Sequence, residues 1–392
     1  MMVNEVKTFI SDETIQFGFV GIKMKQKVKL KDIASYSKGQ QINGDKLLKD
    51  GIYDYLNGGI YPSGKWHSYN VDGNTITISE GGNSSGYVNY MNQPFWCGAH
   101  CYYLFDTVGD IKYLYYALKS QQERIMKIRS GACMPNIKKV DLGNFEFLFD
   151  DDRLVQHQVV EILDKICCII NQYKCQLVDL DKLIKSRFVE MFGDPISNPM
   201  GWNKKPFLDM GECKNGMNFH QDDAGIEIHC LGVGDFKDLT LIDDVEKLPM
   251  VSLNEMPSEE YLLKDGDIVF VRSNGNKALV GRSLAVYPDD VPTTFSGFCI
   301  RYRKTDDAIS IPYLLRVLKT ESMRQKMVGR GANIQNLNQQ ILRALEIPVP
   351  PIELQNQFAT FVRQTDKLKD VEQKRLEKLQ LLFDSLMQKY FG

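Results

Sequence analysis

The sequence predicts an α+β protein that contains two globular mixed α/β domains separated by two long antiparallel coiled-coil helices, with a pseudo-twofold internal repeat. Three observations predict this fold: the chain matches itself after about 200 residues, each copy ends in an unbroken heptad pattern, and short β-rich runs alternate with turn residues elsewhere. The expected boundaries are a first domain at 1–150, a central helix at 151–195, a second domain at 196–347 and a C-terminal helix at 348–392.

An internal repeat organises the chain. Residues 111–120 and 311–320 share five identical positions of ten, where average composition would give about one. With a single one-residue slip, the match continues at the pairs Gly131/Gly331, Asn136/Asn336, Gln156/Gln355 and Phe192/Phe391. Residues 43–110 and 219–307 share little beyond a strand-like run, so a common frame carries two different inserts. Drift after duplication is the alternative explanation, since it also spares a core and erodes loops.

A heptad pattern covers the end of each copy. Apolar residues recur there mostly at alternating steps of four and three, which is the seam of a coiled coil. The two seams are Val159, Ile162, Ile166, Ile169, Tyr173, Leu177, Leu180 and Ile184, and Leu354, Phe358, Phe361, Leu368, Leu376, Leu379, Phe383 and Leu386. Neither segment contains an internal Gly or Pro, so each helix is expected to run for about 38 residues, or nearly 60 Å. A single helix cannot bury such a seam alone, and the two are therefore expected to pack antiparallel.

The remainder of each copy is typical of a mixed α/β domain. Runs rich in Ile, Val, Tyr and Phe predict strands at 74–79, 101–105, 267–272 and 298–303. Glycine-rich turns follow at 80–86 and 273–276, and amphipathic helices are predicted near 111–128 and 311–328.

Composition limits the class of protein. The chain has 392 residues, of which 25% are charged and 10% aromatic, and this excludes wholesale disorder, collagen-like repeats and a disulfide miniprotein. Its 48 Lys and Arg against 50 Asp and Glu give a net charge of −2. That balance argues against a nucleic-acid binder unless basic residues gather on a local surface.

The start of the chain and the cysteines indicate a compartment. No signal-peptide-like apolar core follows Met1, and no apolar run approaches the roughly 18 residues of a membrane helix. The nine cysteines are odd in number and form no C-x-x-C pair, which indicates reduced thiols. We therefore expect a soluble, cytoplasmic protein with no membrane partner.

The sequence shows no active site. Residues 59–65 fit the G-x-x-x-x-G-K pattern of a phosphate-binding loop, but Trp66 replaces the Ser or Thr that holds Mg²⁺, and Pro62 would obstruct the nest of amides. Cys97, His100 and Cys101 lie close together, yet a zinc site needs four ligands in paired spacing, so packing in a core strand is the better interpretation. We assign no catalytic, cofactor-binding or metal-binding residue to this chain.

Both inserts instead place basic, planar and amide-bearing side chains in glycine-rich loops. Arg and Lys read guanine edges, Asn and Gln read adenine, and small hydroxyl groups contact phosphates, although turn formation is the alternative role for any single Asn, Gly or Ser. The candidate DNA-binding residues of the first copy are Lys38, Gln41, Ser63, Lys65, Trp66, His67, Asn83, Ser84, Tyr87, Arg129 and Asn136. Those of the second copy are Lys214, Asn218, His220, Arg272, Asn274, Asn276, Lys277, Arg282, Arg330, Asn333 and Asn336.

The order of insert, long helix, insert and long helix resembles the specificity (S) subunit of type I restriction-modification systems. Three stretches carry this resemblance over essentially the whole chain: residues 331–337 (Gly-Ala-Asn-Ile-Gln-Asn-Leu), 347–357 (Ile-Pro-Val-Pro-Pro-Ile-Glu-Leu-Gln-Asn-Gln) and 188–195 (Phe-Val-Glu-Met-Phe-Gly-Asp-Pro). The first copy departs from the pattern, because residues 147–153 (Phe-Leu-Phe-Asp-Asp-Asp-Arg) replace the proline-rich start of the second helix. The beginning of the first helix is therefore less sharply predicted.

The resemblance implies a non-catalytic subunit that reads a bipartite, asymmetric double-stranded DNA target, with one recognition domain per half. It also implies two modification (M) subunits that use S-adenosylmethionine and two restriction (R) subunits that use ATP and Mg²⁺, so that this chain binds no cofactor itself. Two alternatives stay open at this point: a coiled-coil adaptor with no DNA role, and an orphan or phage-borne S-like protein that captures or blocks M subunits.

Overall fold

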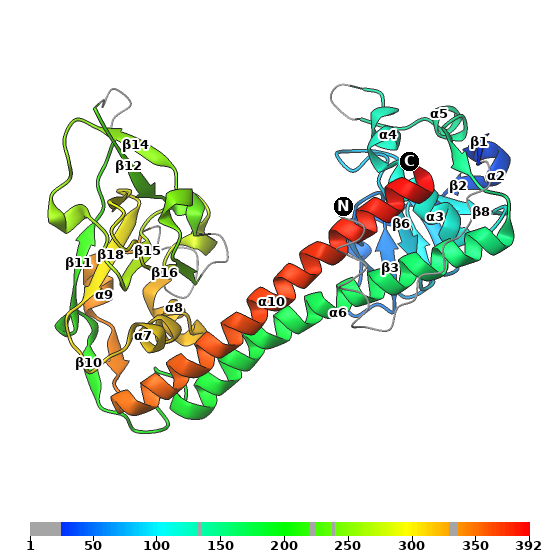
Figure 1. Ribbon diagram of the computed structural model, residues 1–392. Coiled ribbons are helices and arrows are strands. Elements are labelled where there is room, and N and C mark those ends of the chain that lie inside the picture. The colour runs from blue at the N-terminus through cyan, green and yellow to red at the C-terminus, as the bar shows by residue number, and fades with distance from the viewer. Residues whose placement is uncertain (1–24, 132–134, 220–224, 237–239, 329–335) are drawn as a thin grey trace. The chain divides into compact units, whose positions relative to one another are not determined.

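The computed structural model describes residues 25–131, 135–219, 225–236, 240–328 and 336–392. These residues form two compact units (Figure 1). Unit 1 contains the described residues up to Cys175 together with Glu372–Gly392, and unit 2 is Gln176–Val371. Each unit therefore contains one globular domain and a part of each long helix.

The strands of unit 1 form three sheets. The largest is antiparallel and has the order β2 (Ser35–Lys38), β8 (Cys101–Phe105), β5 (Thr75–Ser79) and β6 (Val88–Met91). The second has the order β4 (Gly64–Trp66), β3 (Tyr53–Leu56) and β7 (Phe95–Cys97), with β3 and β7 parallel, and the third pairs β1 (Gln26–Lys29) with β9 (Glu146–Phe149). The short helices are α2 (Leu30–Ile33), α3 (Ile111–Ser120), α4 (Gln122–Lys127) and α5 (Lys139–Gly143).

Unit 2 repeats this topology. Its largest sheet has the order β11 (Gly211–Asn215), β18 (Cys299–Lys304), β15 (Asp267–Val271), β16 (Ser283–Val286) and β13 (Leu241–Ile242). The smaller sheets are β14 (Met250–Leu253), β12 (Ile226–Leu231) and β17 (Thr293–Phe295), with β12 and β17 parallel, and the pair β10 (Lys204–Pro206) and β19 (Glu346–Pro348). The short helices are α7 (Ile311–Leu318), α8 (Glu321–Val328) and α9 (Gln339–Arg343). Only β13 lacks a counterpart in the described part of unit 1.

Short 3₁₀ turns fill several connections: Gly44–Lys46, Phe207–Asp209, Val233–Asp235, Val245–Lys247, Glu259–Tyr261 and Lys277–Leu279. The four strands predicted from sequence agree with β5, β8, β15 and β18 to within one residue at each end. The internal repeat is thus a repeat of structure as well as of sequence.

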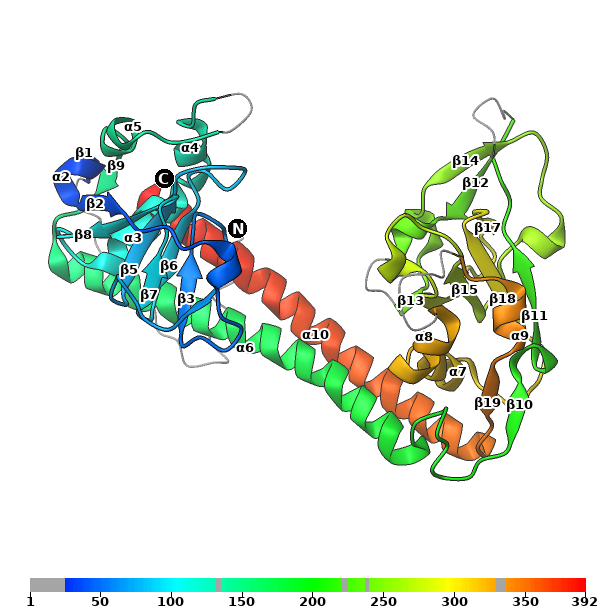
Figure 2. The same ribbon diagram turned by 180° about the vertical axis from the view of Figure 1, so that it is seen from behind.

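The two long helices are α6 (Arg153–Phe192) and α10 (Ile352–Phe391), each 40 residues long. In unit 1, Val159 near the start of α6 packs in one core with Tyr390 at the end of α10. In unit 2, Phe188 near the end of α6 packs against Phe358 near the start of α10, with ring centroids 5.6 Å apart. The helices therefore run antiparallel, as the heptad pattern predicts, and both views show them side by side (Figures 1 and 2).

The last turn of each long helix completes a globular core. Phe391, at the end of α10, lies 5.1 Å from Tyr113 of α3 between ring centroids, and both side chains are buried in unit 1. Phe192, at the end of α6, lies 4.7 Å from Tyr313 of α7 in unit 2. The matching Phe-Gly pairs of the sequence repeat thus mark the same packing position in the two units.

A buried glutamine joins each long helix to its globular domain. In unit 1, Gln156 Oε1 accepts from the backbone N–H of Asp110, the N-cap of α3, at 2.7 Å, and its Nε2 donates to the carbonyl of Asp150 at 2.6 Å. In unit 2, Gln355 Oε1 accepts from Ser310, the N-cap of α7, at 2.8 Å. Neither glutamine has exposed surface. The sequence match at these positions therefore corresponds to one repeated polar junction.

The structure corrects two sequence predictions. Leu368, which the heptad pattern assigns to the seam of the C-terminal helix, is 55% exposed. The helices expected at 111–128 and 311–328 are each two helices, broken at Gln121 and at residues 319–320. Ser120 Oγ and Thr320 Oγ1 donate to carbonyls three residues back, each at 2.8 Å, which competes with continuation of the helix. Gln121 Nε2 donates instead to the carbonyl of Phe391 at 3.0 Å. Within the described residues, none of the helices combines the length and apolar character needed to cross a membrane.

The glutamine junction yields a stability prediction. Gln156→Leu keeps the volume of the side chain but leaves the N–H of Asp110 and the carbonyl of Asp150 without this partner. Each buried group that loses its hydrogen bond costs about 1–3 kcal/mol, so we expect faster amide hydrogen exchange in α3 and a lower denaturation midpoint. Gln158→Leu, an exposed site on the same helix, is the control, and equal effects of the two substitutions would contradict the role of the junction.

Candidate nucleic-acid interface

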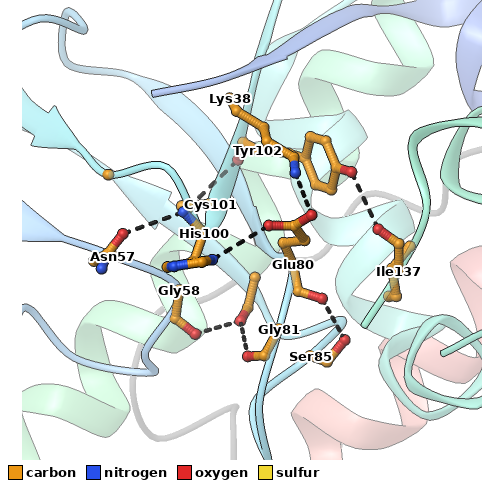
Figure 3. Close-up of polar contacts among 12 residues, drawn as sticks. Lys38, Asn57, Gly58, Glu80, Gly81, Ser85, His100, Cys101, Tyr102 and Ile137 are labelled. Atoms are coloured by element: carbon orange, nitrogen blue, oxygen red, sulfur yellow. Dashed lines mark hydrogen bonds and ion pairs between the residues drawn. The ribbon is translucent and has the colours of Figure 1, made fainter. Parts of the chain in front are cut away.

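One edge of the largest sheet of unit 1 carries a cluster of charged side chains (Figure 3). Lys38 ends β2, Glu80 follows β5 and His100 precedes β8, and we call these three residues the Glu80 cluster. The Lys38 ammonium pairs with Glu80 Oε1, and His100 Nδ1 lies 3.5 Å from Glu80 Oε2. The Glu80 side chain is only 9% exposed, whereas those of Lys38 and His100 are 42% and 63% exposed. A buried carboxylate therefore holds two exposed nitrogen-bearing groups.

The backbone of Glu80 is fixed from three sides. Its N–H donates to the carbonyl of His100 at 2.9 Å, while its own carbonyl accepts from the N–H of Ile137 at 2.9 Å and from Ser85 Oγ at 2.7 Å. Tyr102, whose hydroxyl donates to the carbonyl of Ile137 at 3.1 Å, lies beneath the Lys38 ammonium with the ring centroid 5.5 Å from Nζ. The cluster is thus held by main-chain bonds as well as by its charges.

Several predicted residues lie in the loop next to this cluster. Ser84 Oγ donates to the carbonyl of Gly58 at 2.6 Å, so this hydroxyl has a role in the turn. Arg129 Nη1 donates to the carbonyl of Asn83 at 3.4 Å, and Asn136 exchanges two 2.9 Å backbone bonds with Ser130. The side chains of Asn83, Arg129 and Asn136 are exposed. Predicted loop and frame residues therefore share one surface.

Tyr87 has a defined partner in the same region. The Lys119 ammonium lies 3.8 Å from its ring centroid and donates to the carbonyl of Val88 at 2.9 Å. Burial lowers the pKa of Lys119 to about 8. Tyr87 is thus part of a packed cation–aromatic contact and is only partly exposed.

A second group of predicted residues lies on and beside β4 in the small sheet of unit 1: Ser63, Lys65, Trp66 and His67, while Gln41 lies in the connection between β2 and β3. Trp66 stacks near His67 with centroids 4.4 Å apart, and Lys65 Nζ lies 4.0 Å from a carboxylate oxygen of Asp54. Ser63 Oγ donates to the carbonyl of Tyr55 at 3.4 Å, and Gln41 Nε2 donates to that of Ile42 at 3.2 Å. The candidate residues of the first copy thus lie in two separate regions of unit 1, one beside the Glu80 cluster and one around the small sheet.

In unit 2, Arg272 occupies the place that Glu80 occupies in unit 1. Its N–H donates to the carbonyl of Phe298 at 2.8 Å, and its carbonyl accepts from Leu337 at 2.8 Å. Its guanidinium Nη1 donates to the carbonyl of Gly297 at 3.3 Å. Asn336 pairs with Ser273 in an isolated β-bridge beside it, as Asn136 pairs with Gly81 in unit 1.

The other candidates of unit 2 have mixed positions. Asn274 and Asn276 use their side-chain oxygens to accept from the N–H groups of Asn276 and Ala278, at 2.7 and 3.1 Å, so both stabilise their own loop. Lys214 pairs with Glu260 at 2.7 Å, and that hydrogen bond raises the pKa of Lys214. Arg282 is half-buried at the start of β16.

Asn218 is exposed and follows β11. His220, Arg330 and Asn333 lie outside the described residues, and of Lys277 only the backbone is described. The structure therefore places most of the predicted residues near sheet edges and loops, and these assignments to DNA contact stay predictions.

Sequence reasoning missed Glu80, His100 and Phe298 as members of these sites. Glu80 is acidic and opens a glycine-rich turn, and the spacing of His100 from Cys97 and Cys101 points to metal binding or packing and not to DNA contact. The signal that could have found them is the register of the repeat, because each residue directly follows or precedes a strand that has a counterpart in the other copy.

The cysteines beside His100 are packing residues. Cys97 and Cys101 are buried, and Cys97 Sγ donates to the carbonyl of Cys101 at 3.4 Å. The hydrogen bond with Cys101 and burial raise the pKa of the Cys97 thiol well above its usual range. Across the described residues, no group of three or more His, Cys, Asp or Glu side chains is arranged to hold a metal ion.

Thiol burial yields a chemical prediction. Cys168 and Cys175 are exposed on α6, whereas Cys230 and Cys299 are buried, and burial raises the pKa of both thiols to about 12. Because the thiolate is the reactive form, iodoacetamide at pH 8 should label Cys168 and Cys175 before the other cysteines that the structure describes. Peptide mass spectrometry with and without denaturant measures this order. Rapid native labelling of Cys97 would contradict its assignment to the core.

Comparison with known proteins supports the repeat. The family model for the type I restriction modification DNA specificity domain matches the chain twice, over residues 23–177 and 199–381. A type I specificity subunit of Mycoplasma genitalium is 38% identical over 129 residues, which are 32% of this chain and 33% of that protein. The match thus spans about a third of the relative's length.

Two further comparisons cover more of the chain. The StySPI type I restriction enzyme specificity subunit of Salmonella potsdam is 24% identical over 341 residues, which are 80% of this chain and 72% of that protein. The crystal structure of an S subunit of a type I restriction-modification system from M. genitalium shares the fold, with a TM-score of 0.61 and 22% identity over 94% of this chain and 96% of that one. The chain therefore belongs to the type I restriction-modification DNA specificity family and contains the specificity domain twice.

Proposed function

We propose that this chain is the non-catalytic DNA sequence-specificity subunit of a type I restriction-modification complex. It reads a bipartite, asymmetric double-stranded DNA target, with one recognition domain for each half. The observation that carries this proposal is the repeated frame with different side chains at equivalent positions, such as Glu80 and Arg272. Two domains of one topology that present different chemistry are suited to reading two unlike short sequences.

The long helices set the separation of the two halves in this proposal. A 40-residue helix spans about 60 Å, and at 3.4 Å per base-pair step this length covers at most about 17 base pairs. The target is then two short sequences separated by a fixed, unread gap.

The helices also provide a surface for partner subunits. Apolar side chains stand exposed along them, including Leu183 and Val189 on α6 and Leu368 and Leu381 on α10. Exposed apolar surface on a long helix is suited to contact with another chain. We assign to it two methyltransferase (M) subunits, which bring S-adenosylmethionine, and to the assembled complex two restriction (R) subunits, which bring ATP and Mg²⁺.

The first test exchanges an insert. Replacing residues 43–110 by the corresponding insert of another family member should change one half of the methylated sequence and leave the other half intact, because the second domain is untouched. Methylation-sensitive sequencing of DNA from cells that express the chain with its M subunit measures this. An unchanged methylome would refute the assignment of reading to the domains.

The second test shortens the helices. Deleting one heptad from both α6 and α10 removes about 10 Å, so the gap should shorten by about 3 base pairs or assembly should fail. The measurements are the methylated motif and the mass of the complex. An intact complex with an unaltered gap would contradict the helices as spacers.

Binding data separate this function from that of an adaptor. The complex should bind specific duplex DNA with an affinity that falls as salt concentration rises, because phosphate contacts release counterions. An orphan or phage-borne S-like adaptor would instead bind or block M subunits and leave the affinity of the M subunits for DNA unchanged or lower.

A further inference from the structure

Three positions at one sheet edge have the same backbone arrangement in the two units. They are Lys38, Glu80 and His100 in unit 1, and Asn215, Arg272 and Phe298 in unit 2. Lys38 stands opposite Tyr102 in the β2/β8 register, and Asn215 stands opposite Ile300 in the β11/β18 register. The N–H of Glu80 donates to the carbonyl of His100 at 2.9 Å, and the N–H of Arg272 donates to that of Phe298 at 2.8 Å.

A second main-chain hydrogen bond comes from the segment that leads to the next short helix. The carbonyls of Glu80 and Arg272 accept from Ile137 and Leu337 at 2.9 and 2.8 Å. All these bonds use main-chain atoms, so they hold the position without restricting the side chain. These main-chain bonds therefore leave the type of side chain open, proline excepted, since each needs a backbone N–H at the Glu80 or Arg272 position.

The side chains at these fixed positions differ in charge and shape. Unit 1 has a cation, a buried carboxylate and an imidazole, whereas unit 2 has an amide, a guanidinium and a phenyl ring. The residue that precedes the strand is exposed in both units: the side chain of His100 is 63% exposed, and Phe298 as a whole residue is 62% exposed. Two domains that bind different DNA sequences require different side chains at equivalent backbone positions.

In unit 1 the carboxylate positions the donors. Glu80 pairs with Lys38 and faces His100 Nδ1, while the Tyr102 ring supports the ammonium from below (Figure 3). An ammonium has three donors, and one pair to Glu80 leaves others for a guanine O6 or N7. The exposed His100 ring has its second nitrogen on the side away from Nδ1, where it can meet a base edge.

In unit 2 a basic residue, Arg272, occupies the position of the acidic Glu80. Among the described residues, the Arg272 side chain donates from Nη1 to the carbonyl of Gly297, and the other guanidinium donors can meet a guanine edge in the bidentate manner. The exposed ring of Phe298 beside it suits the methyl group of thymine.

We propose that these sheet-edge positions read bases: Lys38 and His100 in one half of the target, with Glu80 as their positioning residue, and Arg272 with Phe298 in the other half. This inference rests on the proposed function and names the residues that perform it. The competing explanation is that the Glu80 cluster only stabilises a turn.

The experiment uses the chain in complex with its M subunit and sequences the methylated sites of genomic DNA. Lys38→Met should lower the preference for the correct base in one half by about 5- to 150-fold at the position read, and Arg272→Met should do so in the other half only. Matched controls are Lys27→Met, an exposed lysine of unit 1 that pairs with Glu146, and Arg343→Met, an exposed arginine at the end of α9. Both controls should leave the motif unchanged.

Glu80→Gln tests positioning. It removes the charge but keeps the shape, so it should relax the same half as Lys38→Met. At the base position that Lys38 reads, the double substitution should relax the preference no further than Lys38→Met alone. Lys38→Arg retains a donor and should preserve the preference for guanine.

Several outcomes overturn the inference. One is that all variants methylate the wild-type motif; another is that Lys38→Met and Arg272→Met weaken methylation equally at every sequence, which would indicate phosphate contact only. Independent, additive effects of Glu80→Gln and Lys38→Met would refute positioning. A wild-type complex with no two-part motif would instead refute the proposed function, so the two failures are distinguishable.

Discussion

The arrangement of each unit depends on one buried amide, that of Gln156 in unit 1 and of Gln355 in unit 2. This side chain accepts from the N-cap of α3 or α7 and donates to a carbonyl just before the long helix, that of Asp150 in unit 1 and that of Pro350 in unit 2. Two segments about 45 residues apart in sequence are thereby joined by a buried hydrogen bond. Because buried backbone groups without partners are costly, the junction permits few alternatives, and the domain is held on its helix at this point.

The two faces of the largest sheet differ in how closely the two units match. The face of β5 and β15 that packs toward the helices is alike in both units, with Ile76 and Ile78 matched by Ile268 and Phe270. The opposite face differs, since Thr77 in unit 1 is replaced by Val269 in unit 2, which joins a further apolar cluster under the insert. Divergence has therefore accumulated on the side of the sheet that does not meet the helices.

Local periodicity explains how much the sequence could predict. Heptads and alternation are repeated over many residues, so the long helices and the main strands follow from the sequence alone. The break at Gln121 does not, because the local hydrogen bond of Ser120 is accompanied by a contact of Gln121 with Phe391, 270 positions away. Glu80 was missed for the same reason: its partner Lys38 is 42 positions away, and a single acidic residue in a turn has no local signal.

The near-zero net charge is consistent with the pairing of candidate DNA-binding lysines with carboxylates. Lys38, Lys65 and Lys214 each lie beside a carboxylate, and so they contribute less to a general attraction for phosphate than free lysines would. Such pairing weakens binding to every sequence equally, whereas a donor already fixed in direction loses little when it meets the correct base. Specificity is the difference between the affinity for the target sequence and the affinity for other DNA. A specificity subunit increases this difference more by lowering its affinity for non-specific DNA than by raising its total positive charge. Within the proposed function, an acidic residue such as Glu80 thus favours discrimination, which a count of basic residues does not reveal.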